Sequence, residues 1–429
     1  MPHTSDYLLI GACAAVGTFA LTYPVKWGAA RLGWVVAPDA RRVHTVTTPD
    51  VGGIAMFGGF LIAIIVSKLM GTFDSLFNVT SEMLGIVVAA AVIFIVGLLD
   101  DVREISAPAK VAGTVVAGLV LVWYGVTMYY FRLPLVDVFL LATDWVPLIT
   151  IVWLLGMSQA INLIDGLDGL AAGVVAIAAS AFFLYSRELE GQSFLSEPNI
   201  GPLICIIAAG ICLGFLPHNF NPAKIFMGDS GALLLGLLMA TATSVVGGRS
   251  SPDQKFFGQS YFFFAPLFIP LLILGVPIFD TLFTIVRRAS RRQGLATADK
   301  GHLHHRLMNL GHGQRRSVLI LWLWTALLSA FVLYPVYTNS GASLAVIGIL
   351  ALGLGLFTVL HPEARRTRAR HSTMLVSRAT GAMRAEPVDD DDADIDDADI
   401  GDADIDDDAD IDGEPGGRAD PVDRHHLGE

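Results

Sequence analysis

Residues 145–186 read WVPLITIVWLLGMSQAINLIDGLDGLAAGVVAIAASAFFLYS, in which two apolar runs flank the short polar sequence NLIDGLDGL. The runs, near 145–161 and 169–186, approach the roughly 20 residues that an α-helix needs to cross the hydrocarbon core of a bilayer. This stretch therefore predicts two membrane-spanning helices joined by a polar connection.

Similar apolar runs recur from Tyr7 to Leu360, and about eleven spans are expected. They lie near 7–25, 53–71, 82–99, 108–128, 145–161, 169–186, 200–217, 230–247, 261–286, 317–337 and 342–360. The composition agrees, because 53% of the residues are hydrophobic and only 16% are charged, which is too apolar for an ordinary soluble chain. The expected fold is an all-α polytopic membrane protein whose membrane domain covers residues 1–360.

The positions of Lys and Arg predict the orientation of the chain. The connections after odd-numbered spans, together with the C-terminal segment, hold 23 of the 28 Lys and Arg residues. By the positive-inside rule these connections and the C-terminus are cytoplasmic and the N-terminus is outside. The opening residues MPHTSDYLL lack the basic region of a cleavable signal peptide, so the first span is expected to be retained.

The net charge of −12 is divided unevenly along the chain. Residues 386–429 hold 20 Asp or Glu and two Arg, a net −18, whereas the first 385 residues carry a net +6. The acidic tail repeats Asp, Ala and Ile, and its self-repulsion and lack of aromatic residues predict disorder. Residues 361–385 form a basic juxtamembrane segment between the membrane domain and the tail. The three cysteines lie in apolar runs and predict no disulfide or zinc site.

Polar residues gather at one end of the spans, which is the predicted cytoplasmic end. The third span ends in Asp100 and Asp101, and Lys110 follows at the start of the fourth. Two adjacent carboxylates at the C-terminus of a helix oppose the helix dipole and repel each other. A cation or a proton-transfer role would compensate for that arrangement, while a helix boundary marked by charges is the structural alternative.

Two further connections at this end carry acidic and amide side chains. In NLIDGLDGL, Asn162, Asp165 and Asp168 are spaced by three, which at helical spacing forms a polar stripe on one side. A plain turn between two spans is the structural alternative, although it would account for the glycines and only one Asp. Asp229, in PHNFNPAKIFMGDSG, precedes the eighth span. Its carboxylate can cap that helix, bind a metal ion, or do both.

The segment from Arg287 to Arg316 is the most basic and histidine-rich part of the chain. Its arginines next to the membrane can bind anionic lipid headgroups. His302, His304, His305 and Arg306 place four donors in five positions, which suits a pyrophosphate. Asp280, inside the ninth span, is a secondary candidate, with an ion pair to Arg287 as its structural alternative.

Taken in order, these motifs resemble those of the polyprenyl-phosphate N-acetylhexosamine-1-phosphate transferase family over roughly residues 7–360. They are PDARRVHTVTTPDVGG (which contains Arg41 and His44), the Asp100–Asp101 pair with Lys110, NLIDGLDGL, FNPAKIFMGDSG, PIFDTL and HLHHRL. HLHHRL is similar to the bacterial branch that transfers N-acetylglucosamine 1-phosphate. The peptidoglycan branch typically has an unbroken histidine triplet, which Leu303 interrupts here. NLIDGLDGL departs from the eukaryotic branch, which has Asn at the second Asp.

The resemblance implies a bacterial plasma-membrane enzyme with its active site on the cytoplasmic face. Its substrates would be UDP-N-acetylglucosamine and undecaprenyl or decaprenyl phosphate, and its products would be polyprenyl-diphosphate-N-acetylglucosamine and UMP. This reaction would initiate the synthesis of a cell-envelope polysaccharide. The implied cofactor is Mg²⁺, or Mn²⁺ in its place. Because both substrates are polyanions, their approach requires a divalent cation and basic side chains. Membrane lipid is a further expected partner, and nucleic acid is not. The oligomeric state is left open, and an oligomer is possible.

The resemblance also implies roles for individual residues. Asp229 would be the principal Mg²⁺ ligand, with Asn162 beside it. Asp100 is the candidate base, Asp101 would support the metal or Lys110, and Asp165 is counted with them as catalytic. The implied substrate-binding residues are Lys110, Asp168 and Asn219 on the nucleotide-sugar side, and His302, His304, His305 and Arg306 at the diphosphate.

Two alternatives stay open at this point. One is the phospho-N-acetylmuramoyl-pentapeptide transferase of peptidoglycan synthesis. The other is a polytopic transporter, although transport sites normally lie near the membrane midplane, whereas these motifs crowd one surface.

Overall fold

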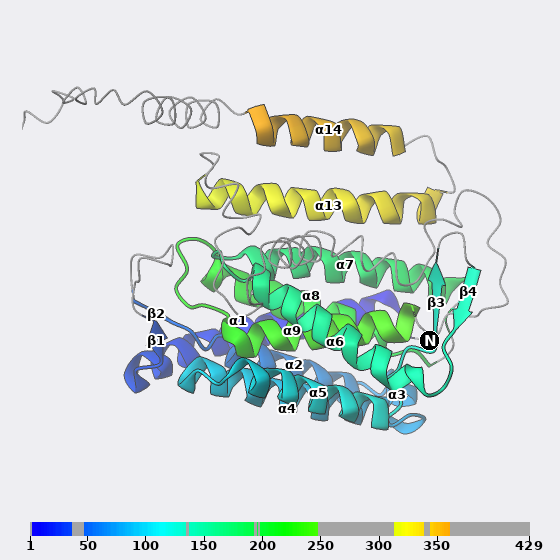
Figure 1. Cartoon of the computed structure of the whole chain (residues 1–429), viewed down its shortest axis with the longest axis horizontal. Helices are drawn as coiled ribbons and strands as arrows, with labels where there is room; N and C mark the ends of the chain where they lie inside the picture. The colour runs from blue at the N-terminus through cyan, green and yellow to red at the C-terminus, as the bar shows by residue number, and fades with distance from the viewer. Residues whose placement is uncertain are drawn as a thin grey trace, which may run out of the picture. The chain divides into compact units, whose positions relative to one another are not determined.

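The computed structural model describes residues 2–36, 47–133, 137–192, 195, 198–247, 313–338 and 344–360. Within these ranges the chain forms eleven helices and two short β-hairpins (Figure 1). The helices are α1 (Thr4–Leu32), α2 (Gly53–Leu69), α3 (Asp74–Asn78), α4 (Glu82–Arg103), α5 (Ala107–Trp123), α6 (Trp145–Ile164), α7 (Leu170–Gly191), α8 (Gly201–Asn219), α9 (Gly228–Gly247), α13 (Gln314–Thr338) and α14 (Leu344–Leu360). The strands are β1 (Val35–Val36), β2 (Thr48–Pro49), β3 (Tyr130–Leu133) and β4 (Asp137–Leu140).

Seven of the described helices are long and apolar enough to cross a membrane: α1, α4, α6, α7, α8, α9 and most of α13. Helices α2 and α5 are apolar but shorter, with 17 residues each. Ten of the eleven predicted spans coincide with a described helix. The ninth, near 261–286, lies outside the described residues, as does the segment from 361 to the end of the tail. The chain is therefore a mostly helical, polytopic membrane protein.

Three local features differ from the sequence prediction. Helix α1 continues through Pro24 to Leu32, because a proline is tolerated in a membrane helix whose neighbours satisfy the freed backbone groups. Helix α5 ends at Trp123 rather than near residue 128, because Gly125 takes a left-handed φ of 85°. The antiparallel hairpin β3–β4 then follows, and β1 pairs with β2, so the described fold is mostly rather than entirely helical.

Helix α9 forms the centre of the described bundle. Every residue from Ser230 to Gly247 is buried, and α9 packs against α2, α4, α6, α7 and α8. Glycine allows the close approach of α6, since a Cβ atom added at Gly236 would lie 2.4 Å from the Cα atom of Ser158. The many small residues of α9, Gly, Ala, Ser and Thr, let neighbouring helices approach closely, which suits its central position.

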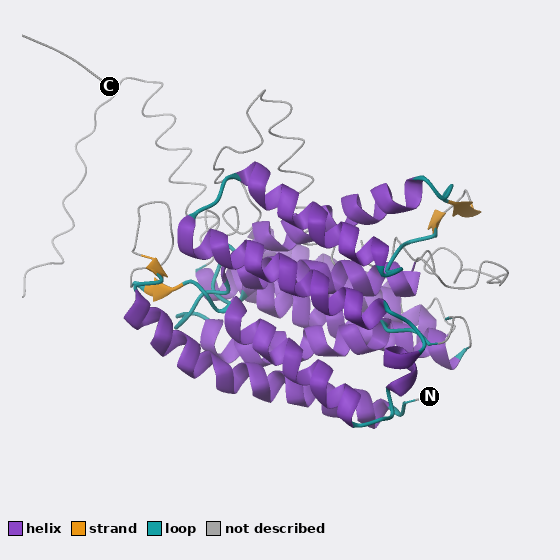
Figure 2. Cartoon of the chain, turned by 90° about the horizontal axis from the view of Figure 1, so that it is seen from below, coloured by secondary structure: helices purple, strands orange, loops and turns teal. Residues whose placement is uncertain are grey.

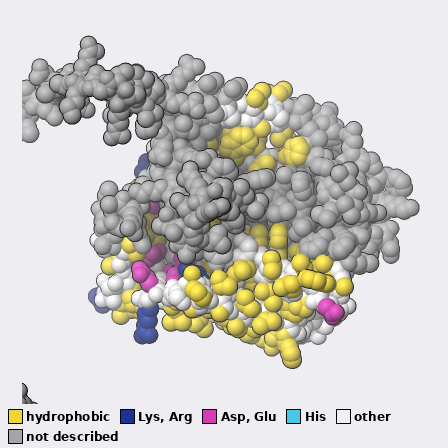
Figure 3. Space-filling view, in the orientation of Figure 1, with side chains coloured by type: hydrophobic (Ala, Val, Ile, Leu, Met, Phe, Trp, Pro, Cys, Tyr) yellow, Lys and Arg dark blue, Asp and Glu magenta, His cyan; other side chains and the backbone are white. Residues whose placement is uncertain are grey.

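The outer helices instead present large apolar side chains to their surroundings. Leu69 at the end of α2 is 79% exposed and Trp123 at the end of α5 is 87% exposed. In Figure 3 hydrophobic side chains cover much of the described surface where α4 and α5 lie, whereas acidic and basic side chains gather near its left end. An apolar outer surface of this kind suits contact with lipid.

The two hairpins lie at opposite ends of the described helices (Figure 2). The β1–β2 hairpin lies beside the start of α9, because the Phe226 N–H donates to the Pro49 carbonyl at 2.8 Å and the Gly52 N–H donates to the Phe226 carbonyl at 2.9 Å. Consecutive helices alternate in direction, so α4, α6 and α8 end, and α5 and α9 begin, at this end of the bundle. The predicted site residues therefore share one end.

Candidate active site

Four helix ends meet around Asp100, Lys110, Asn162 and Asp229. Asp100 lies in the last turn of α4, Lys110 near the start of α5, Asn162 in the last turn of α6, and Asp229 at the start of α9. This arrangement brings together a base candidate, a cation and the two predicted metal ligands, from positions up to 129 residues apart in the chain. The sequence prediction that they share one face is thus matched by the fold.

The turn between α4 and α5 fixes the direction of the Asp100 carboxylate. Helix α4 stops at Glu104, which has a left-handed φ of 49°, and Pro108 lies in the first turn of α5, a position that suits its fixed φ. The Ile105 N–H donates to Asp100 Oδ1 at 3.0 Å. The second oxygen, Oδ2, is left to point toward Lys110.

Lys110 joins the two carboxylates of the cluster. Its Nζ donates to Asp100 Oδ2 at 2.8 Å and also to Asp229 Oδ2. Asn162 Nδ2 approaches the same Asp229 oxygen at 3.4 Å. The side chains of Asp100, Lys110 and Asp229 are 17%, 18% and 22% exposed, so the cluster is largely shielded and still reachable from solvent. Such shielding strengthens the attraction within the group and toward an incoming phosphate or cation.

Asp101 faces a different way from its neighbour Asp100. Its Oδ1 accepts the Asp229 N–H at 2.6 Å, and its Oδ2 accepts both the Ser230 N–H at 3.1 Å and the Ser230 hydroxyl at 2.6 Å. The adjacent acids of the DD pair thus serve different contacts: Asp100 contacts Lys110, and Asp101 contacts the first turn of α9.

Asp168 and Asn219 hold the polar connections beside this cluster. Asp168 Oδ2 accepts the Asn221 side-chain amide at 2.8 Å and the Ala223 N–H at 3.0 Å. Asn219 is buried, accepts the Gly169 N–H at 3.0 Å and donates to the Ile225 carbonyl at 3.0 Å. Both side chains shape the connection before α9, and their predicted contact with substrate stays a prediction.

Asp165 follows the last residue of α6 and lies among other acids. The predicted helical stripe is wrong, because only Asn162 is helical, whereas Asp165 and Asp168 lie in the turn between α6 and α7. Burial raises the pKa of its carboxyl well above the ordinary value, and the negative charges of Asp50, Asp229, Asp101 and Asp168 raise it further. A group of carboxylates that repel one another in this way favours the approach of a cation.

The donor set fits a magnesium ion that is completed by substrate. Among the described residues, no three His, Cys, Asp or Glu side chains are grouped closely enough to hold a metal by themselves. Mg²⁺ usually binds through one or two carboxylates, waters and substrate phosphates rather than in an all-protein cage. The Asp229 carboxylate matches that pattern, and the side-chain amide of Asn162 lies beside it.

Several predicted residues lie outside the described ranges. They are Arg41, His44, Asp280, His302, His304, His305 and Arg306. Conversely, the start of α13 contributes contacts that the sequence analysis does not predict. Asn221 donates to Gln314 Oε1 at 2.8 Å, and Arg315 Nε donates to the Asn221 side-chain oxygen at 3.1 Å. Asn221 in FNPAKIF is a polar residue that could have indicated such contacts, although nothing in the sequence identifies its partners on α13.

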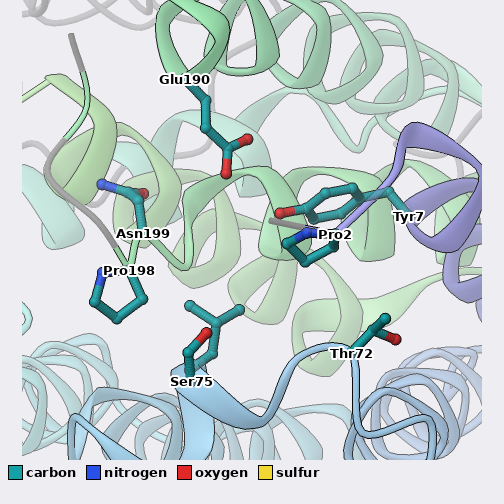
Figure 4. Close-up of a pocket in the computed structure, with 8 residues that line it drawn as sticks. Pro2, Tyr7, Thr72, Ser75, Glu190, Pro198 and Asn199 are labelled. Atoms are coloured by element: carbon teal, nitrogen blue, oxygen red, sulfur yellow. The ribbon is translucent and has the colours of Figure 1, made fainter. Parts of the chain in front are cut away.

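A cavity of about 310 Å³ lies at the other end of the bundle (Figure 4). It is lined by the start of α1, the α2–α3 connection, α3, the end of α7 and the residues before α8, including Tyr7, Thr72, Ser75, Glu190 and Asn199. Glu190 is paired with Arg187, so the cavity wall carries an internally balanced charge. This cavity is separate from the carboxylate cluster.

Comparisons with known proteins agree with the family indicated by the motifs. Residues 83–247 match the family described as Glycosyl transferase family 4. The chain is 36% identical over 367 residues to the decaprenyl-phosphate N-acetylglucosaminephosphotransferase of Mycobacterium tuberculosis, an alignment covering 84% of this chain and 90% of that protein. It is 38% identical over 304 residues to the probable undecaprenyl-phosphate N-acetylglucosaminyl 1-phosphate transferase of Bacillus subtilis, covering 71% and 77% respectively.

A more distant similarity reaches the peptidoglycan branch. The chain is 31% identical over 349 residues to the phospho-N-acetylmuramoyl-pentapeptide-transferase of Moorella thermoacetica, covering 75% of this chain and 96% of that protein. The higher identities to the two N-acetylglucosamine enzymes favour the branch indicated by HLHHRL. The chain therefore belongs to the polyprenyl-phosphate N-acetylhexosamine-1-phosphate transferase family, whose matching segment here is described as Glycosyl transferase family 4.

Proposed function

We propose that this protein transfers N-acetylglucosamine 1-phosphate from UDP-N-acetylglucosamine to a membrane polyprenyl phosphate. The observation that carries the proposal is the Lys110 ammonium group held between Asp100 and Asp229 where helix ends meet. Phosphoryl transfer between two anions depends on positioning and on neutralising charge, and this cluster supplies both a cation and cation ligands. The names of the relatives support the choice of sugar.

In the proposed reaction, an oxygen of the polyprenyl phosphate attacks the β-phosphorus of the nucleotide sugar. A new phosphorus–oxygen bond forms the lipid diphosphate. The bond from the β-phosphorus to the oxygen shared with the α-phosphate breaks, and UMP leaves with the electron pair. A bound Mg²⁺ or Mn²⁺ would neutralise the charge on the diphosphate and on the departing UMP.

The residues of the cluster divide the work. Asp229 and Asn162 would hold the ion, and Lys110 would donate to a phosphate oxygen of the nucleotide sugar. The second pKa of a phosphate monoester is about 6, so a fraction of the polyprenyl phosphate still carries one proton near neutral pH. Asp100 would accept that proton. Asp165, Asp168 and Asn219 would shape the nucleotide-sugar side.

The orientation and the remaining partners belong to the same proposal. The excess of Lys and Arg in the connections at this end supports a cytoplasmic active site in a bacterial plasma membrane, with the N-terminus outside. His302, His304, His305 and Arg306, which lie outside the described residues, would contribute donors to the diphosphate. The acidic tail would remain solvated and outside the catalytic machinery.

The test is UMP release by the purified chain in detergent. With UDP-N-acetylglucosamine, polyprenyl phosphate and Mg²⁺ we expect UMP and a lipid-linked sugar, and no release when either the lipid or the metal is left out. UDP-N-acetylmuramoyl-pentapeptide, offered in a parallel reaction, should be a poor donor. Preferred use of that donor would assign the chain to the peptidoglycan branch, and no lipid-dependent UMP with either donor would refute the proposed reaction.

A further inference from the structure

The first turn of α9 carries the principal metal-ligand candidate and lacks a cap from its own segment. The first four N–H groups of a helix have no partner within the helix, and a side chain just before it usually accepts one of them. The residue before α9 is Met227, whose side chain has no oxygen. The N–H groups of Asp229 and Ser230 therefore need acceptors from elsewhere in the fold.

Asp101 supplies these acceptors from α4. Its two oxygens accept the Asp229 N–H at 2.6 Å, the Ser230 N–H at 3.1 Å and the Ser230 hydroxyl at 2.6 Å. The two oxygens of a carboxyl group can accept only a few hydrogen bonds, so these three bonds occupy most of its capacity. They join two helices whose contacting residues are 128 and 129 positions apart in the chain.

Three glycines allow α2 and α4 to pack closely against this turn. A Cβ atom added at Gly97, one turn before Asp101, would lie 2.4 Å from Ser230 Cα. One added at Gly53 of α2 would lie 2.3 Å from the Gly231 nitrogen. Gly228 itself has a left-handed φ of 68°, and a Cβ there would lie 2.6 Å from Asp101 Oδ2. The close approach of α2 and α4 thus leaves the turn little room to shift.

We propose that Asp101 is a positioning residue, which caps α9 from α4 and thereby fixes the place of the Asp229 carboxylate. The inference rests on the proposed function, in which Asp229 holds the metal ion. It separates the two acids of the DD pair. Asp100, which contacts Lys110, faces the reacting groups, whereas Asp101 acts through Asp229 and is neither the base nor a metal ligand.

The first experiment measures binding of Mn²⁺ alone, by electron paramagnetic resonance of the free ion, to the full chain in detergent. In Asp101→Asn an NH₂ group replaces one acceptor and faces a backbone N–H or the Ser230 hydroxyl. We expect Mn²⁺ affinity to fall roughly 10- to 100-fold, the range typical of residues that orient a metal ligand, with kcat falling and KM for UDP-N-acetylglucosamine little changed.

Ser230→Ala separates positioning from any other role of Asp101, because it removes one of the three bonds and leaves the Asp101 carboxyl group itself unchanged. We expect a smaller loss of Mn²⁺ affinity, about threefold, and Ser186→Ala is the matched control. The Ser186 hydroxyl is likewise buried and bonded within the chain, to the Phe183 carbonyl at 2.8 Å on α7. Unchanged Mn²⁺ affinity in Ser230→Ala would overturn the proposal, even if Asp101→Asn fails to fold.

A cysteine pair tests direct ligation. A thiolate binds Cd²⁺ well and Mg²⁺ poorly, so Cd²⁺ should partly restore metal binding to Asp229→Cys and should not restore it to Asp101→Cys. Recovery by Asp101→Cys would make Asp101 a ligand and refute the positioning role. The Mn²⁺ and Cd²⁺ binding measurements need no sugar nucleotide, so failure of the proposed reaction in the wild-type chain is distinguishable from failure of this inference.

Discussion

Replacing Gly97 with alanine should slow sugar-phosphate transfer even in the molecules that remain folded. A Cβ atom at this position on α4 lies 2.4 Å from Ser230 Cα and 2.5 Å from the Ser230 nitrogen. Ordinary contact begins at 3.4 Å, so the two helices must part by about 1 Å there. Asp229, the residue before Ser230, would then shift relative to Lys110. A misplacement of about 1 Å can cost roughly 10²-fold in rate, whereas one methyl group forced into a packed core costs about 1–3 kcal/mol.

The assay is UMP release at saturating substrates, expressed per folded molecule after size-exclusion chromatography and thermal unfolding in detergent. Gly156→Ala on α6 is the matched control, since a Cβ atom there meets nothing within 4 Å, and this variant should keep the wild-type rate. If Gly97→Ala also turned over at the wild-type rate, the argument that the α4–α9 contact sets the position of Asp229 would be wrong.

Three further outcomes follow from the same structure. Asp229→Ala should abolish Mg²⁺-dependent formation of the lipid-linked sugar, and substantial retained turnover would remove it as the metal ligand. Asn221→Ala removes the side-chain hydrogen bonds to Asp168, Gln314 and Arg315. The free energy of unfolding should fall by about 1–3 kcal/mol, which lowers the unfolding temperature. An unchanged melting curve would contradict this prediction. Deleting residues 386–429 should leave the rate of UMP release nearly unchanged, and a large loss would make the acidic tail part of the enzyme.

The sequence predicts the helices well because a helix that crosses a bilayer needs an uninterrupted apolar run of about 20 residues, and such runs are easy to recognise. It also predicts which end holds the site. A charged residue inside hydrocarbon is costly, so Asp100, Lys110 and Asp229 mark the ends of helices rather than their middles. The fold then places these three side chains in contact, as their shared end of the bundle requires.

The contacts that sequence reasoning misses depend on which helix ends meet. Nothing local distinguishes Asp101 from Asp100; the difference arises because Asp101 faces α9 and Asp100 faces α5. The bond from Asn221 to Gln314 joins residues 93 positions apart, beyond any helical period. The β3–β4 hairpin is missed for another reason, since a four-residue strand leaves little pattern beside the long apolar runs that flank it.

The burial of α9 on every side also sets an order of events during biosynthesis. Among the described helices, those that pack around it, α2, α4, α6, α7 and α8, all precede it in the chain. They leave the ribosome first, and α9 joins neighbours that have already been made. Because Asp229 belongs to α9, a nascent chain that stops before residue 228 has the Asp100–Lys110 pair but not the carboxylate that completes the cluster. The carboxylate cluster can therefore form only after the start of α9 has been synthesised and has packed against α4 and α5.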